Sequence, residues 1–210
     1  IGCCSIIVMV SIGIGMTESQ NQMLENMGDL TIIEVSQGTS QDGKTMNLDD
    51  SAVESFSQIQ GVQAILPKYE TYDYTIEGYA GPNQRYANTD GMSLIGVDTD
   101  ALEDMGYEFI DGKTAGKGKD EGVAGQFFAY AFKDSLLPDG SNMVDYWSAM
   151  YDDQGNEVKD PVYPDPYFNP LNTPVTLKFI DANQNTYERE IKITGIVKED
   201  NGKGYETSQG

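Results

Sequence analysis

The chain contains no histidine, and its only two cysteines are the adjacent Cys3 and Cys4. The first absence removes the side chain that most often serves as a general base near neutral pH or as a metal ligand. The second excludes a disulfide framework and a cysteine zinc site beyond residue 4. A Ser-His-Asp triad is therefore impossible within this sequence.

Positive charge is also scarce. Lysine and arginine together number 13, against 34 aspartates and glutamates, so the formal net charge is −21. A surface of this sign repels phosphate backbones and anionic lipid headgroups. We therefore expect no nucleic-acid partner.

Motifs for catalysis and cofactor binding are missing as well. No G-x-S-x-G nucleophile elbow occurs. Residues 112–120, GKTAGKGKD, have glycines and lysines but not the G-x-x-x-x-G-K-[ST] spacing of a phosphate-binding loop. Paired carboxylates are plentiful by chance among so many acidic residues, and none is marked out. We expect a chain that binds no cofactor and is not an enzyme by itself.

Two acidic segments resemble metal sites but have simpler interpretations. Residues 181–185, DANQN, open like a calcium loop, but Thr186 and Lys192 stand where the loop needs glycine and an acidic ligand. We interpret this segment as a hairpin turn, because Asp and Asn tolerate turn conformations. The second segment, residues 98–104, has the acidic residues Asp98, Asp100, Glu103 and Asp104. We interpret it as the N-cap and first turn of a short helix.

One uncharged apolar run stands at the start of the chain, at residues 1–16. We interpret it as the outer part of a transmembrane helix, although a span needs roughly 20 residues. A signal sequence and a buried core helix are the alternatives. An apolar face continues through Met16, Met23, Leu24 and Met27, and no proline occurs before Gly28. This pattern predicts one helix from residue 6 to residue 27, and residues 17–29 are expected to form a stalk above the membrane.

Beyond the stalk, hydrophobic periodicity predicts a mixed α+β fold. A helix is expected at residues 49–60, with Val53, Phe56 and Ile59 buried against a sheet. The clearest hairpin joins the last two of the four strands; the strands are expected at residues 30–35, 62–66, 175–180 and 187–197.

The segment 133–172 differs in composition from the rest. It is rich in proline and tyrosine and holds the only tryptophan. Its rings either pack the segment against the main body or form a rigid recognition face. The candidate partner-binding residues are Tyr146, Trp147, Tyr151, Tyr163, Tyr167 and Phe168.

Several segments occur in an order that resembles the extracytoplasmic core domain of MacB/FtsX-type ABC transporter permeases. They are the apolar helix running into a stalk that ends MGDLTIIEV, then GVQAILP, LIGVDTDAL, VAGQFFAYAF and the closing strand IKITGIVKE. The resemblance implies a porter-like β-α-β lobe with a smaller inserted lobe, preceded by the transmembrane and stalk helix. It divides the chain into residues 1–16, 17–29, a discontinuous main lobe at 30–132 and 173–210, and the insertion or part of a second lobe at 133–172.

The same resemblance implies a function in transport. The domain lies outside the cell membrane, extracellular or periplasmic, and couples ATP hydrolysis by a separate cytoplasmic ATPase subunit to motion in export or efflux. A second permease copy or a related permease is the expected membrane partner, and a peptide, lipoprotein, lipid or drug is the expected cargo. The alternative is a stand-alone membrane-anchored binding or adhesion module that uses the aromatic insertion.

Overall fold

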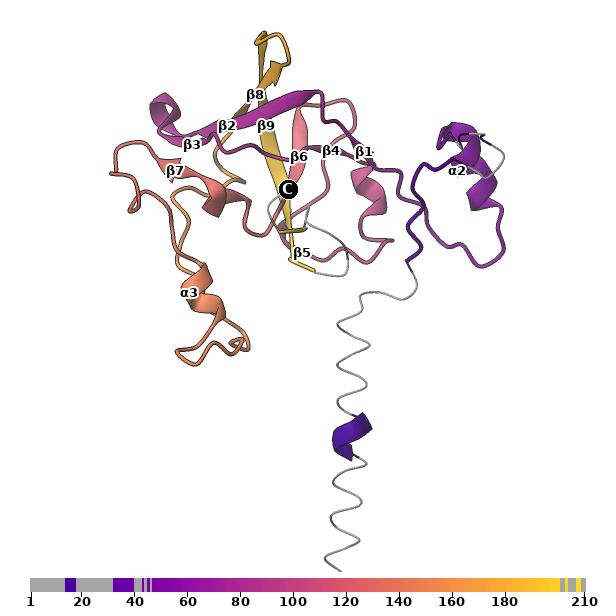
Figure 1. The fold of residues 1–210 in the computed structure, drawn as a ribbon, viewed down its shortest axis with the longest axis horizontal. Coiled ribbons are helices and arrows are strands. Elements are labelled where there is room, and N and C mark those ends of the chain that lie inside the picture. The colour runs from indigo at the N-terminus through magenta and orange to yellow at the C-terminus, as the bar shows by residue number, and fades with distance from the viewer. Residues whose placement is uncertain are drawn as a thin grey trace, which may run out of the picture.

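The computed structural model describes residues 14–17, 32–39, 43, 45, 47–200, 203 and 207–208 (Figure 1). Sheet predominates over helix in these ranges, which confirms a mixed helix and sheet chain. Residues 14–17 are helical, whereas the rest of the helix expected from residue 6 to residue 27 lies outside the described residues. Among the described helices, none combines the length and the apolar character needed to cross a bilayer.

A twisted, mainly antiparallel sheet forms the body of the molecule (Figure 1). The predicted hairpin is confirmed as β8 (Val175–Asp181) and β9 (Thr186–Val197), which pair antiparallel. The strands follow the order β5-β9-β8-β2-β3-β7, and β6 lies parallel to β9. The other strands of this sheet are β2 (Tyr74–Ala80), β3 (Tyr86–Asn88), β5 (Phe109–Gly112), β6 (Glu121–Gly125) and β7 (Lys133–Asp134). A separate two-stranded sheet pairs β1 (Tyr69–Glu70) with β4 (Ile95–Gly96).

The helices are short and lie at the margins of the sheet. The predicted helix forms as α2 (Asp50–Ser57), whose N-cap Asp49 accepts hydrogen bonds from the Ser51 and Ala52 amides. The other helices described beyond residue 47 are η1 (Pro82–Gln84), η2 (Thr99–Ala101), η3 (Phe128–Ala131) and α3 (Trp147–Met150). In Figure 1, α3 lies partway along the segment of residues 133–172, here termed the insertion, and a loop extends beyond the helix.

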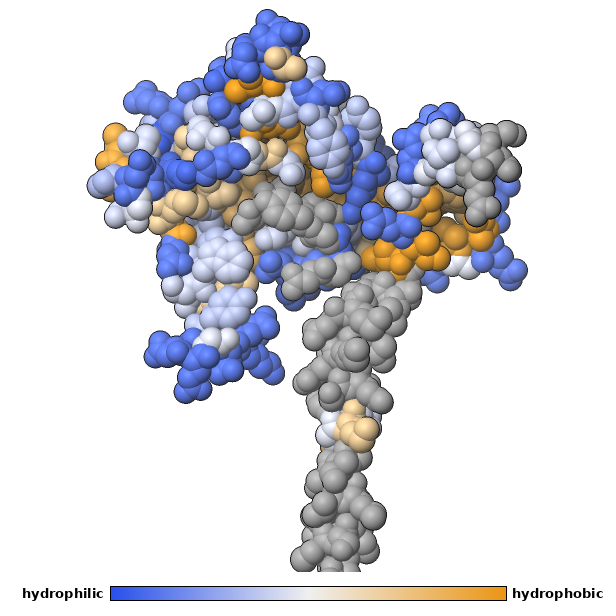
Figure 2. All heavy atoms as spheres, in the orientation of Figure 1, coloured by the Kyte–Doolittle hydropathy of each residue, from blue (hydrophilic) through white to orange (hydrophobic). Residues whose placement is uncertain are grey.

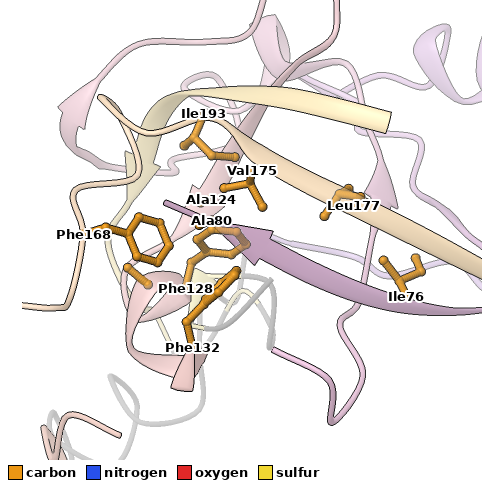
Figure 3. Packing of buried hydrophobic residues seen from close by; sticks show 10 residues of the cluster. Ile76, Ala80, Ala124, Phe128, Phe132, Phe168, Val175, Leu177 and Ile193 are labelled. Carbon is orange, nitrogen blue, oxygen red and sulfur yellow. The ribbon is translucent and has the colours of Figure 1, made fainter. Parts of the chain in front are cut away.

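The main core lies on one face of the sheet (Figure 3). Alternate residues of β2 point into it, and Val175 and Leu177 of β8 lie beside them. Rings from the η3 segment and from the insertion cover this face: Phe128, Phe132 and Phe168. Phe132 is completely buried. The core therefore ties a residue of the insertion, Phe168, to the sheet.

Glycine allows β5 and β9 to approach closely at their ends. Gly112 has φ +76°, and a Cβ there would overlap the carbonyl oxygen of Thr194. Only glycine adopts this conformation and leaves that space free. The contact holds β5 against β9, next to a second core cluster of Leu102, Tyr107 and Val197.

Three expectations about the N-terminal part of the domain are wrong. Residues 32–35 and 62–66 are not strands, and residues 30–31 lie outside the described residues. Helix α2 buries no side chain: Val53 and Phe56 are only half-buried, and Ile59 is exposed. β-Branched residues favour a strand only where a neighbouring strand accepts their backbone hydrogen bonds. No such neighbour lies beside these segments among the described residues.

Candidate functional site

The structure separates the six aromatic residues proposed for partner binding. Only Trp147 and Tyr151 are exposed, with 55% and 47% of their surface accessible. The buried pair is Tyr146 and Phe168, and the half-buried pair is Tyr163 and Tyr167. Some of these aromatic residues therefore pack inside the segment and others are exposed to solvent. A partner would contact the exposed pair, Trp147 and Tyr151.

Trp147 is the outer ring of an aromatic stack. It lies 5.3 Å from Tyr146 with an interplanar angle of 29°. Tyr146 in turn stacks on Phe127 at 4.5 Å and 15°. Phe127 is almost completely buried and comes from the turn before η3. A surface tryptophan is thus fixed in place by rings that reach the interior.

Other tyrosines close the sides of this stack. Tyr163 meets Phe127 edge-on at 5.0 Å, and Tyr130 lies 5.1 Å from Tyr146. The Tyr130 hydroxyl donates a hydrogen bond of 2.7 Å to the Pro164 carbonyl. Burial raises the pKa of both tyrosines, and nearby carboxylates add to the effect. The insertion therefore has a small core of its own, which Phe127 anchors. Phe127 is not among the aromatic residues predicted from the sequence, because it lies outside residues 133–172.

A half-buried ion pair holds the base of the insertion. The Arg85 guanidinium donates to both carboxylate oxygens of Asp134, at 2.9 Å from Nε and 2.5 Å from Nη2. Asp134 is buried, and its Oδ1 also accepts the Leu136 amide. The hydrogen bonds from Arg85 hold the pKa of the Asp134 carboxyl below its usual value. The pair fixes the chain where the insertion leaves β7.

The insertion is acidic. Between residues 135 and 172, seven aspartates and glutamates accompany a single lysine, Lys159, so this segment carries a net charge of −6. No salt bridge found in the described part of the chain uses any of these carboxylates. Instead, some accept local hydrogen bonds: Asp145 from Ser148, and Asp152 from Asn156. Figure 2 shows the strongly hydrophilic tip of this segment beyond its paler, aromatic part.

The loop at residues 112–120 and residues 97–99 line an open pocket of about 420 Å³ next to η2. Its polar groups are already engaged. Lys117 Nζ lies 3.0 Å from Asp98 Oδ2 and 3.3 Å from Asp100 Oδ2. The Gly116 amide donates to Glu121 Oε2 at 2.8 Å. Of the three lysines of the loop, Lys117 and Lys119 pair with carboxylates of the same chain, and one amide is bonded to Glu121, so much of the loop's capacity to hold a phosphate is already used.

The two acidic segments behave as structural elements. Asp181 Oδ1 accepts the amides of Asn183 and Asn185, both at 2.8 Å, which confirms a hairpin turn. Asp98 accepts the Asp100 amide at the start of η2, which confirms the N-cap. Within the described ranges, no three acidic, cysteine or histidine side chains form a group that could hold a metal ion.

Exposed apolar residues also gather around α2. Figure 2 shows a hydrophobic area beneath this helix. Exposed apolar residues of the segments that flank the helix include Ile33, Val35, Ile59 and Val62. They lie in the stretches that the sequence marked as strands and as a buried helix face.

Comparison with protein families tests the resemblance found in the sequence. Residues 1–142 match the family described as the MacB-like periplasmic core domain. The chain belongs to this family. Comparisons with curated proteins and with solved structures give no match. The MacB-like assignment confirms the resemblance found in the sequence.

The family assignment indicates the type of protein to which this domain belongs. A MacB-like periplasmic core domain is the extracytoplasmic part of an ABC transporter permease, and this family of domains is not itself enzymatic. The matched range ends at residue 142, so Tyr146 and Trp147 lie beyond it. The exposed end of the aromatic stack is thus a feature that the MacB-like match does not cover.

Proposed function

We propose that this domain transmits motion. ATP hydrolysis by a separate cytoplasmic ATPase subunit would move the membrane and stalk helix, and through it the extracytoplasmic domain, in export or efflux. A second permease copy or a related permease would complete the transporter, and the cargo would be a peptide, lipoprotein, lipid or drug. The observation that carries this proposal is the family match, which extends from residue 1 through the apolar run and the stalk segment into the sheet.

Mechanical transmission requires a helix without a flexible joint. No proline occurs between residue 1 and Gly28, which is consistent with continuity. Gly13 and Gly15 are the weak points, each costing about 1 kcal/mol relative to alanine in a helix interior. The proposal therefore predicts that the coupling is sensitive to flexibility between the bilayer and the sheet.

The test is a flexible Gly-Ser segment inserted after Glu18 of the full-length permease in its transporter complex. We expect ATP hydrolysis to continue while transport falls, because the inserted joint absorbs the displacement. The matched control carries the same insertion after Asp153, in the exposed turn of residues 152–155, and should transport normally. Normal transport by the Glu18 variant would refute the mechanical role.

A stand-alone binding or adhesion module is the second candidate. The observation in its favour is the exposure of Trp147 on a stack of buried rings. The content of the complete gene and of its neighbourhood would distinguish the two candidate functions. Further transmembrane segments and a neighbouring ATPase gene support the permease, whereas a gene that encodes neither supports the adhesion module.

A further inference from the structure

The exposed face of Trp147 has no partner in the described structure. One ring face lies against Tyr146, so the accessible 55% of the residue belongs to the opposite face and the ring edge. Buried tryptophans contribute to core packing, whereas exposed ones on rigid supports are enriched among the residues that dominate binding interfaces. Because the stack holds the indole in place, binding to it costs little side-chain entropy.

Carboxylates lie near the rings of the aromatic stack. Asp145 accepts hydrogen bonds from the amide and hydroxyl of Ser148, and the Trp147 amide also contributes to its lowered pKa, so its charge lies beside the indole's own backbone. Burial is the main cause of the raised pKa of Tyr163 and of Tyr130, and nearby carboxylates raise both further: Glu199 and then Glu157 for Tyr163, and Asp165 for Tyr130. The rings of the stack are thus rimmed by negative charge that no lysine or arginine neutralises in the described residues.

An open indole face beside carboxylates is chemically complementary to a cation. Lysine and arginine side chains bind over the face of tryptophan, the best of the aromatic rings for this interaction. A nearby carboxylate adds a charge-assisted hydrogen bond. The apolar stems of the same side chains lie well on the exposed ring of Tyr151.

We propose that the Trp147 stack and its acidic rim bind a basic polypeptide segment of another protein, with a lysine or arginine over the indole. The net charge of the chain opposes the other occupants. A second copy carries −21 as well, and an anionic bilayer surface is repelled for the same reason. This inference goes beyond the mechanical role and does not depend on it.

Trp147 is the only tryptophan of the chain, so its fluorescence reports on this site alone. The probe is a synthetic peptide that alternates arginine and leucine, titrated into the full chain in detergent. We expect the Trp147 emission to shift to the blue and its quenching by acrylamide to fall. A peptide that alternates glutamate and leucine should leave both unchanged, and added salt should weaken the binding.

Variants are tested through the anisotropy of the dye-labelled arginine peptide. Trp147→Ala should weaken binding about tenfold. Asp145→Asn should weaken it about threefold. The asparagine side-chain oxygen can still accept the Ser148 amide, so the backbone contact is kept. Tyr72→Ala is the matched control: this ring is 87% exposed near carboxylates but lies between β1 and β2, and its loss should change nothing.

Binding of the arginine peptide that is insensitive to both Trp147→Ala and Asp145→Asn would overturn the proposal. So would equal binding of the glutamate peptide, or an unchanged tryptophan emission at saturating arginine peptide. Circular dichroism of each variant checks the fold. Failure of this binding test would not affect the mechanical proposal, because the transport assay of the Glu18 and Asp153 insertion variants tests that proposal separately.

Discussion

Removal of the Phe132 ring should destabilise the sheet and the insertion together. The side chain is completely buried, 5.3 Å from the Phe128 ring and 5.0 Å edge-on from the Phe168 ring. Phe132→Ala removes the transfer free energy of the ring and leaves a cavity, which together cost about 3–5 kcal/mol. Gly78 lies beneath the ring, and its strand is held on both sides by β3 and β8, so the cavity cannot collapse easily. We therefore expect Phe132→Ala to lower the free energy of unfolding by about 4 kcal/mol.

The assay is urea unfolding followed by two signals. Far-ultraviolet circular dichroism reports on the sheet, and the Trp147 emission reports on the insertion. We expect both midpoints to fall together, because η3 lies between the Phe127 stack and the Phe132 core. The thermal midpoint should drop by about 8–16 °C for a domain of this size.

Two further variants grade the effect. Phe132→Leu keeps most of the volume and should cost about 1–2 kcal/mol. Tyr72→Ala removes an exposed ring and should change stability by less than about 0.5 kcal/mol. A loss below about 1 kcal/mol for Phe132→Ala would refute the reasoning about the core. A Trp147 transition that stays in place while the sheet signal moves would show that the insertion unfolds on its own.

Three other predictions concern backbone and charge. Gly112→Ala should unfold the domain at lower urea concentration than Gly140→Ala, because both have positive φ but only the first Cβ overlaps the β9 backbone; equal effects would contradict this. The Asp134 carboxylate, whose pKa its arginine partner lowers, stabilises the fold above the unfolded pKa of about 3.9, and this contribution is lost as pH falls further; Asp134→Asn should flatten the acid limb of stability measured by denaturation. Tyr79, whose pKa the neighbouring glutamate raises to about 12, should ionise late in an alkaline absorbance titration, and Tyr79→Phe should remove that late step while leaving the earlier ones.

Strong local patterns were sufficient for part of the fold. The hairpin of β8 and β9 was predictable because alternating residues flank a turn whose Asp181 bonds to its own backbone. The cap of η2 at Asp98 follows from the same kind of local bond. In both cases the residues that decide the structure are neighbours in the chain.

The predictions for the N-terminal part were wrong because the structure there depends on contacts with residues far away in the chain. Residues 30–35 have a strong β-branched pattern, and the stripe of Val53, Phe56 and Ile59 has helical spacing. Pattern shows that a segment is suited to burial or to pairing, but it does not supply the surface that buries it. The helix formed, while the expected contacts of Ile59 with a sheet did not.

The sequence by itself determined the charge, the absence of catalytic histidine and of a cysteine framework, the closing hairpin and the resemblance to MacB-like domains. These properties rest on composition, on neighbouring residues or on the order of segments. Only the tertiary structure decided which aromatic residues of the insertion meet solvent. Tyr146 and Trp147 are adjacent and chemically alike, yet the first is buried and the second is exposed. The reason is Phe127, which lies outside the insertion and stacks on Tyr146 alone of the two, so burial here is set by a contact between distant parts of the chain.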